Sequence, residues 1–80
     1  MPKLSPVSYK LLACVFERDG FKCVREEGDH MIFTKQGVLR PVVVPKYRNI
    51  PIFIIKNDLR TAGMSRDRYF ELLAWCLSRG

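Results

Sequence analysis

The chain is 80 residues long, which is enough for one domain with a single modest core. Almost half of its residues are apolar (48%), which excludes a disordered chain, and no apolar run approaches the roughly 18 to 20 residues of a transmembrane helix. The formal net charge of +6 makes a polyanion such as nucleic acid the first partner to consider, although small domains also carry such charge for solubility alone.

The three cysteines, Cys14, Cys23 and Cys76, are scattered and odd in number, and they form no Cys-x-x-Cys pair. We therefore expect neither a zinc site nor thiol exchange. Cys14 and Cys76 lie within apolar helical patterns, where a free cysteine packs as a small hydrophobic residue. The first residues also lack the apolar stretch of a secretory signal. The sequence thus predicts unpaired cysteines in a soluble, cytoplasmic protein that contacts no membrane.

The first predicted element is a helix that begins at Ser5 and Pro6, which suit the N-cap and the first helical position. Gly20 can end this helix with a positive φ. Between them, apolar residues recur at helical spacing: Val7, Leu11, Leu12, Val15 and Phe16.

Three strand-like segments follow the first helix. Residues 21–26 alternate polar and apolar side chains, residues 27–29 have turn chemistry, and residues 30–35 alternate again. After a second turn, residues 38–44 are rich in β-branched side chains and predict a third strand. Pro41 has no N–H for the ladder, so we expect this strand at an edge of the sheet or locally irregular. The simplest arrangement is a three-stranded antiparallel meander.

The last third of the chain predicts one ambiguous element and one clear helix. Residues 50–55 are rich in isoleucine and favour a strand locally, whereas Ile52, Ile55 and Leu59 follow a helical stripe that Gly63 could cap. Ser65 can cap a final amphipathic helix whose apolar positions lie between residues 69 and 77.

The only histidine, His30, directly follows the turn Gly28-Asp29. Histidine exchanges protons near neutral pH because its ordinary pKa is about 6.5, so a histidine on a basic domain suggests a small nuclease. Gly28 is expected to adopt a positive φ, and Asp29 to accept hydrogen bonds from turn amides or, less favoured, to orient the imidazole. One histidine and dispersed carboxylates do not make a zinc set, so we expect no metal and no other cofactor.

Basic side chains are spread over the predicted sheet and the segment after it, as on a folded face rather than in a disordered tail. Arg25 alternates with residues 21 and 23 and could also be a solvated edge charge, and Lys35 lies on the opposite face of its strand from His30. The residues expected to contact nucleic-acid phosphates are Lys22, Arg25, Lys46, Arg48 and Lys56.

Several short motifs occur in a characteristic order. A helix ends in Gly20-Phe21, residues 23–27 lead into Gly28-Asp29-His30, a hairpin ends in residues 42–45 (Val-Val-Val-Pro), and a helix closes with residues 62–65 (Ala-Gly-Met-Ser). In this order and spacing the chain resembles the HicA family of bacterial toxins. The resemblance covers residues 11–73 of a single domain, residues 1–80.

The resemblance implies an α+β fold like that of a double-stranded-RNA-binding domain: a helix, a three-stranded antiparallel sheet and a helix, with both helices on one face. An additional C-terminal helix follows in this chain, and the isoleucine-rich segment is expected to be a helix over residues 53–62. The resemblance further implies a metal-independent mRNA endoribonuclease of a type II toxin–antitoxin system, inhibited by a HicB-type antitoxin. His30 stands where the family has its catalytic histidine, as general acid/base.

Two departures from the family pattern bear on catalysis. Many relatives carry a further histidine where residues 46–48 here read Lys-Tyr-Arg, and residues 53–56 read Phe-Ile-Ile-Lys in place of Gly-Thr-Leu-Arg. The second proton transfer then falls to a basic side chain, to Tyr47, to water, or to a second His30 in a homodimer. Two other functions stay open: a non-catalytic RNA-binding module, and a degenerate toxin that retains only antitoxin binding.

Overall fold

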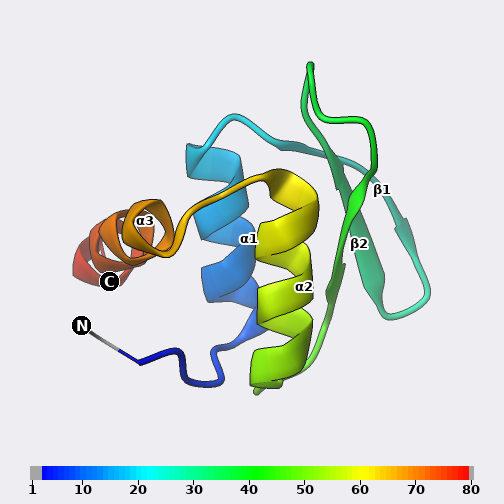
Figure 1. Ribbon diagram of the computed structural model, residues 1–80. Helices are drawn as coiled ribbons and strands as arrows, with labels where there is room; N and C mark the ends of the chain where they lie inside the picture. The colour runs from blue at the N-terminus through cyan, green and yellow to red at the C-terminus, as the bar shows by residue number, and fades with distance from the viewer. Residues whose placement is uncertain (1–2, 80) are drawn as a thin grey trace.

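The structure, a computed structural model that describes residues 3–79, arranges three helices and three strands around one core. The strands form one antiparallel sheet in the order β1-β2-β3, and Figure 1 shows α1 and α2 on the same side of it, with α3 against α1. The α+β fold and its additional C-terminal helix are therefore confirmed. In chain order, the elements are α1 (Tyr9–Arg18), β1 (Lys22–Glu27), β2 (His30–Thr34), β3 (Val42–Pro45), α2 (Ile52–Ala62) and α3 (Arg66–Arg79).

Helix α1 begins later than its sequence predicts. Ser8, not Ser5, is the N-cap, and its hydroxyl accepts a hydrogen bond from the backbone N–H of Leu11 at 3.3 Å. This bond satisfies one of the N–H groups that the first turn of a helix leaves free. The preceding residue, Val7, is paired instead with Ile50 in an antiparallel bridge. The start of α1 is thus set by contact with a distant segment.

The sheet departs from the predicted strands at two places. β3 covers only the end of the predicted segment of residues 38–44, because the ladder with β2 begins at Val42, after Pro41. β3 is an edge strand, as Pro41 indicates. In β1 the register shifts between Cys23 and Arg25, so the simple alternation expected for residues 21–26 is broken.

The core lies between the sheet and the two helices that cover it. Its aromatic centre is Phe16, whose ring lies 5.3 Å from that of Phe21 and 6.3 Å from that of Phe33. In α2, Ile55 and Leu59 are buried against this core. The isoleucine-rich segment is therefore a helix, in which its apolar stripe is buried, and this packing outweighs its local preference for a strand.

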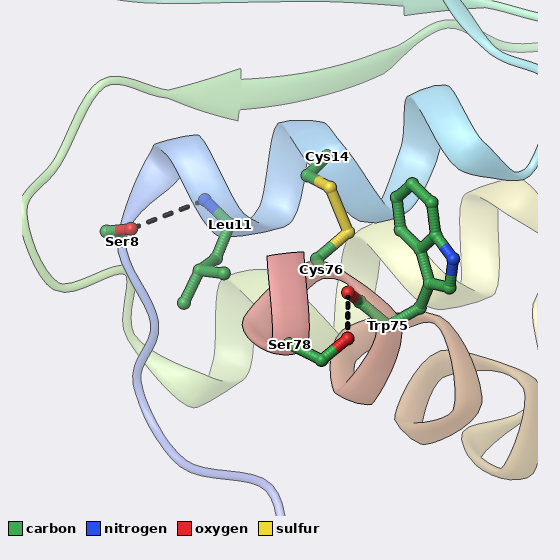
Figure 2. Close-up of a disulfide and its surroundings, with 6 residues drawn as sticks. All are labelled: Ser8, Leu11, Cys14, Trp75, Cys76 and Ser78. Carbon is green, nitrogen blue, oxygen red and sulfur yellow. Dashed lines mark hydrogen bonds between the residues drawn. A yellow bond between two sulfur atoms is a disulfide. The ribbon is translucent and has the colours of Figure 1, made fainter. Parts of the chain in front are cut away.

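The prediction of three unpaired cysteines is wrong. Cys14 of α1 and Cys76 of α3 form a disulfide that joins positions 62 residues apart (Figure 2). Both residues lie on helices, as their apolar surroundings predict, but only the packing of α3 on α1 brings their Cα atoms to 6.1 Å. Cys23 is free. Because disulfides are rare in cytosolic proteins, the cysteines no longer argue for a reducing compartment.

Candidate functional site

His30 is the first residue of β2 and directly follows a two-residue hairpin loop. Glu27 pairs with His30 across the hairpin, so Gly28 and Asp29 alone form the loop. Gly28 has a φ of 57°, which favours glycine, although a Cβ there would meet no atom within 4 Å. The Asp29 carbonyl accepts a hydrogen bond from the backbone N–H of Lys46 at 2.6 Å, which ties the loop to the end of β3. This fixed turn presents an exposed His30 side chain.

The carboxylate of Asp29 makes no hydrogen bond with any of residues 3–79. The loop is held by its backbone, so neither of the two roles considered for this side chain is visible in the structure. Lys35 forms an ion pair with Asp19 at 3.3 Å and lies over the ring of Phe21, in accord with its predicted place away from His30.

His30 borders a hollow of about 560 Å³ between the sheet and α2. The sheet side of the hollow is formed by His30 with Val43 and Pro45 of β3, and Tyr47 follows at one end. The other wall belongs to α2 and consists of Phe53, Ile54, Lys56, Asn57, Asp58 and Arg60.

A second hollow, of about 600 Å³, adjoins the first because Asn57 and Arg60 border both. Its far wall is the loop between β2 and β3, residues 37–40, and it reaches the end of α2 at Gly63. We call the two hollows together the α2 trough. The trough extends along α2 from His30 at one end to Arg40 and Gly63 at the other.

Three cationic side chains border the α2 trough: Arg40, Lys56 and Arg60. All three are exposed, and none has a carboxylate oxygen within 4.0 Å among residues 3–79. Lys56 and Arg60 are four residues apart and therefore neighbours on the surface of α2. The trough can accordingly offer three cations to an anionic ligand.

Asp58 is the one carboxylate among the residues that line the α2 trough. It is only 4% exposed, and its Oδ2 has no hydrogen-bond partner among residues 3–79. Burial raises the pKa of this carboxyl to about 7, because the charged form loses its hydration. Near neutral pH, Asp58 therefore exchanges a proton in the wall of the same hollow that His30 borders.

Of the five residues predicted to contact RNA phosphates, only Lys56 borders the α2 trough. Lys46 and Arg48 border a separate hollow beside the start of α1. Lys46 also forms an ion pair with Glu26, and this hydrogen bond raises the pKa of the Lys46 ammonium.

The two predicted contacts on β1 also lie apart from the trough. Arg25 forms an ion pair with Glu27 at 2.5 Å. Lys22 pairs with Thr34, at the opposite end of the hairpin from His30. The structure therefore does not gather the five predicted residues around His30.

The sequence counts Arg40 and Arg60 among the basic residues of a folded face but does not single them out as phosphate contacts, and it does not single out Asp58 at all. Once residues 53–62 are taken as a helix, Arg60 falls one turn after Lys56 on the exposed face, and Asp58 falls on the apolar stripe, where an acid is unusual. Those two signals were present in the sequence. Arg40 carried no such signal, because its place beside α2 depends on how the loop between β2 and β3 packs.

Within residues 3–79, no group of three or more His, Cys, Asp or Glu side chains could hold a metal ion. None of the helices described is long and apolar enough to span a lipid bilayer.

Comparison with known proteins identifies a family whose model matches this chain. The family model described as the HicA toxin of bacterial toxin–antitoxin systems matches residues 11–64, which are 54 of the 80 residues. Neither the curated proteins nor the solved structures include a significant match. The matched segment runs from α1 to just beyond α2, so it contains the turn before His30 and all the residues that line the α2 trough. The chain belongs to the HicA toxin family.

Proposed function

We propose that this protein is the toxin of a type II toxin–antitoxin system and that it cuts mRNA as a metal-independent endoribonuclease. Membership of the HicA toxin family supports the toxin role. The observation that carries the enzymatic part is the position of His30, which is exposed at one end of a trough bordered by three cations that have no acidic partner within residues 3–79.

RNA supplies its own nucleophile, the 2′-OH next to the phosphate to be cut. The 2′-oxygen bonds to phosphorus, its proton passes to a base, and the bond from phosphorus to the 5′-oxygen breaks as that oxygen takes up a proton. No metal is required to generate the nucleophile. His30 can act as the general acid or base, and Lys56 and Arg60 can stabilise the charge that develops on the phosphoryl oxygens.

The α2 trough suits a single strand of RNA. Proteins bind single strands with a cationic groove for the backbone and exposed aromatic rings on which bases stack. Here Arg40, Lys56 and Arg60 are the cations, and Phe53 and Tyr47, 73% and 44% exposed, are the rings. A strand along α2 would place a phosphate beside His30. Lys22, Arg25, Lys46 and Arg48, which lie apart from the trough, would meet only a longer RNA.

A toxin of this family is expected to have an antitoxin, and we propose that a HicB-type partner covers the α2 trough. Three apolar side chains around His30 are exposed: Val43, Tyr47 and Phe53. Apolar groups next to cations that lack an acidic partner among residues 3–79 suit an acidic protein surface, and electrostatic attraction would speed the association of the two proteins.

The decisive experiment compares His30→Ala with Thr34→Ala, which alters another exposed residue of β2 away from the trough. We expect His30→Ala to lower RNA cleavage at least about 100-fold, as for loss of a general acid or base, while unfolding free energy changes by no more than about 0.5 kcal/mol. Thr34→Ala should leave cleavage unchanged. Chelator should have no effect, and a 2′-deoxy residue at the cut site should block cleavage by the unaltered protein.

A folded His30→Ala protein with full activity would overturn this mechanism. If the unaltered chain binds RNA but never cuts it, the non-catalytic RNA-binding function is the correct one. If it neither binds nor cuts RNA but still binds an antitoxin, the chain is a degenerate toxin.

A further inference from the structure

We propose that Asp58 is a second catalytic residue: its carboxylic acid protonates the departing 5′-oxygen of the RNA, while His30 accepts the proton of the 2′-OH. This assignment rests on the ribonuclease function proposed above. It answers a requirement that one histidine cannot meet, since the reaction moves two protons and the chain contains a single imidazole.

The position of Asp58 is the first argument. His30 and Asp58 border the same hollow, one at the start of β2 and the other in the middle of α2. The hollow, about 560 Å³, falls within the range of roughly 300 to 1,000 Å³ that is typical of small-ligand sites. A phosphate inside it would have an acid–base group on each side and Lys56 and Arg60 beside it.

The burial of Asp58 is the second argument. The residue occupies the apolar stripe of α2, next to Leu59 and one turn after Ile55, where an apolar side chain would be stable. The Oδ2 atom of this buried carboxyl has no hydrogen-bond partner in the described part of the chain, which lowers stability, and groups of this kind occur preferentially at functional sites. Burial also raises the pKa of Asp58 to about 7, so the protonated form needed by a general acid is present near neutral pH.

A second buried polar group provides an internal comparison. The hydroxyl of Tyr69 in α3 also has no partner among residues 3–79, and burial raises the pKa of this phenol to about 12. Tyr69 borders neither hollow of the α2 trough, and its ring packs against that of Phe70. The phenol keeps its proton at neutral pH, and the group lies away from the hollow in which RNA is proposed to bind. Of these two groups, only Asp58 combines burial and a proton exchangeable near neutral pH with a place in the lining of the hollow that His30 borders.

The other charged and titratable groups around the hollow are His30 and Tyr47 on the sheet side and Lys56 and Arg60 on α2. Burial opposes the ionised carboxylate of Asp58 and is the cause of its raised pKa, to which neither cation contributes. A bound phosphate would neutralise these cations and add negative charge of its own. RNA binding is therefore expected to keep Asp58 protonated until the leaving oxygen takes the proton.

The proposed step is balanced in atoms and charge. The 2′-O–H proton passes to the imidazole of His30 as the 2′-oxygen bonds to phosphorus. The bond from phosphorus to the 5′-oxygen breaks, and that oxygen takes the proton of the Asp58 carboxyl. The products are a 2′,3′-cyclic phosphate and a 5′-hydroxyl, with His30 protonated and Asp58 ionised. Exchange of one proton with water restores each group, and no other reactant is needed.

The test replaces the leaving oxygen by sulfur. A thiolate leaves without being protonated, so an RNA with a bridging 5′-sulfur at the cut site needs a base but no acid. On ordinary RNA, we expect kcat/KM of the unaltered protein, which reports the pKa values of the free protein, to fall as the pH rises above about 7, because Asp58 loses its proton. On the sulfur substrate this fall should disappear. This comparison requires no variant, so it stands even if a substitution unfolds the protein.

The variant Asp58→Asn sharpens the test, because an amide of nearly the same shape cannot act as the acid. We expect it to cut ordinary RNA about 100- to 10,000-fold more slowly, and the sulfur substrate at close to the unaltered rate. Its affinity for an RNA with a 2′-deoxy residue at the cut site should be unchanged. Asp67→Asn, the same change at an exposed position of α3, and Tyr69→Phe, which removes the other unpartnered group, should cut both substrates normally.

The outcomes separate this proposal from the proposed function. The role of Asp58 would be overturned if Asp58→Asn cuts ordinary RNA at the normal rate, or if its cleavage rate falls equally on ordinary RNA and on the sulfur substrate. Either result would leave His30 as the base. If His30→Ala cuts the sulfur substrate at the normal rate, His30 is the acid, and this result would also overturn the proposed role of Asp58. Full activity of His30→Ala on ordinary RNA would instead refute the proposed mechanism itself.

Discussion

Gly28 sets the direction in which His30 leaves the hairpin. Its φ of 57° is accessible to glycine without strain but costs other L-residues roughly 1 to 2 kcal/mol. No atom lies within 4 Å of a Cβ at this position, so the cost of Gly28→Ala should be that of the backbone alone. We expect the free energy of unfolding to fall by about 1 kcal/mol, as measured by denaturant titration. Asp29→Ala, whose carboxylate bonds to no described residue, is the control, and an equal loss there would contradict this explanation.

The buried carboxyl of Asp58 makes stability depend on pH with a defined sign. Its pKa is about 7 in the folded protein, above the ordinary 3.8, so the folded state holds this proton more tightly. The free energy of unfolding is therefore highest below about pH 4, where the folded and unfolded states both hold the proton. It falls as the pH rises through 7, by roughly 4 kcal/mol at most.

Asp58→Asn should remove this dependence. We expect the variant to be more stable than the unaltered protein at pH 8, by about 1 to 3 kcal/mol after the cost of burying an amide, and no more stable at pH 4. Thermal unfolding at both pH values measures the difference, with Asp67→Asn as the control. A variant that is less stable at pH 8 would show that the carboxylate has a partner there.

At the scale of elements, α2 is the helix expected to hold the RNA backbone. Lys56 and Arg60 face the trough, whereas Lys46 is paired with Glu26 and borders another hollow together with Arg48. Each phosphate contact contributes about 0.7 to the slope of log affinity against log salt for a single strand. Replacing Lys56 and Arg60 by Ala should therefore lower the slope by about 1.4, as measured with a short single-stranded RNA.

The matched double variant is Lys46→Ala with Arg48→Ala, which removes the same charge after β3. It should change the slope for the short RNA less than the α2 pair does. If the two double variants change it equally, the strand also crosses the loop after β3, as the sequence predicts. If only the variant with Lys46→Ala and Arg48→Ala changes the slope, the RNA does not follow α2.

The sequence predicted most elements correctly, because apolar periodicity and the glycine and proline residues at element boundaries are local signals. It failed where an element depends on a distant contact. Ser8 caps α1 because Val7 pairs with Ile50, and Cys14 meets Cys76 because α3 packs on α1. The position of His30 beyond its turn was predictable from spacing. The trough was not, because its walls come from β3, α2 and a loop that only the tertiary structure brings together.

At the scale of the whole molecule, the proposed site and the C-terminal addition lie on different sides. The α2 trough lies between α2 and β3, whereas α3 packs against α1 (Figure 1). A partner that covers His30 therefore need not contact α3. We expect a HicB-type antitoxin to bury at least about 1,200 Å² in total over the trough and to stop RNA cleavage.

Co-expression with the neighbouring gene product, with a tag on one chain only, tests this expectation. Phe53→Ala removes an exposed apolar side chain at the trough and should weaken the complex, whereas Leu77→Ala, an exposed apolar residue of α3, should not. If the partner fails to co-purify, or if the complex still cuts RNA, the proposed inhibition is wrong.

The disulfide between α1 and α3 lies beside the only tryptophan of the chain. Trp75 precedes Cys76 (Figure 2) and borders the same small hollow as Cys14. The guanidinium groups of Arg18 and Arg79 lie 4.0 and 4.8 Å from the centroid of its ring. A nearby disulfide quenches indole fluorescence. Reduction of the Cys14–Cys76 disulfide should therefore increase the fluorescence intensity of Trp75. The chain thus contains a natural optical reporter of its own oxidation state, readable without a label while RNA cleavage is followed separately.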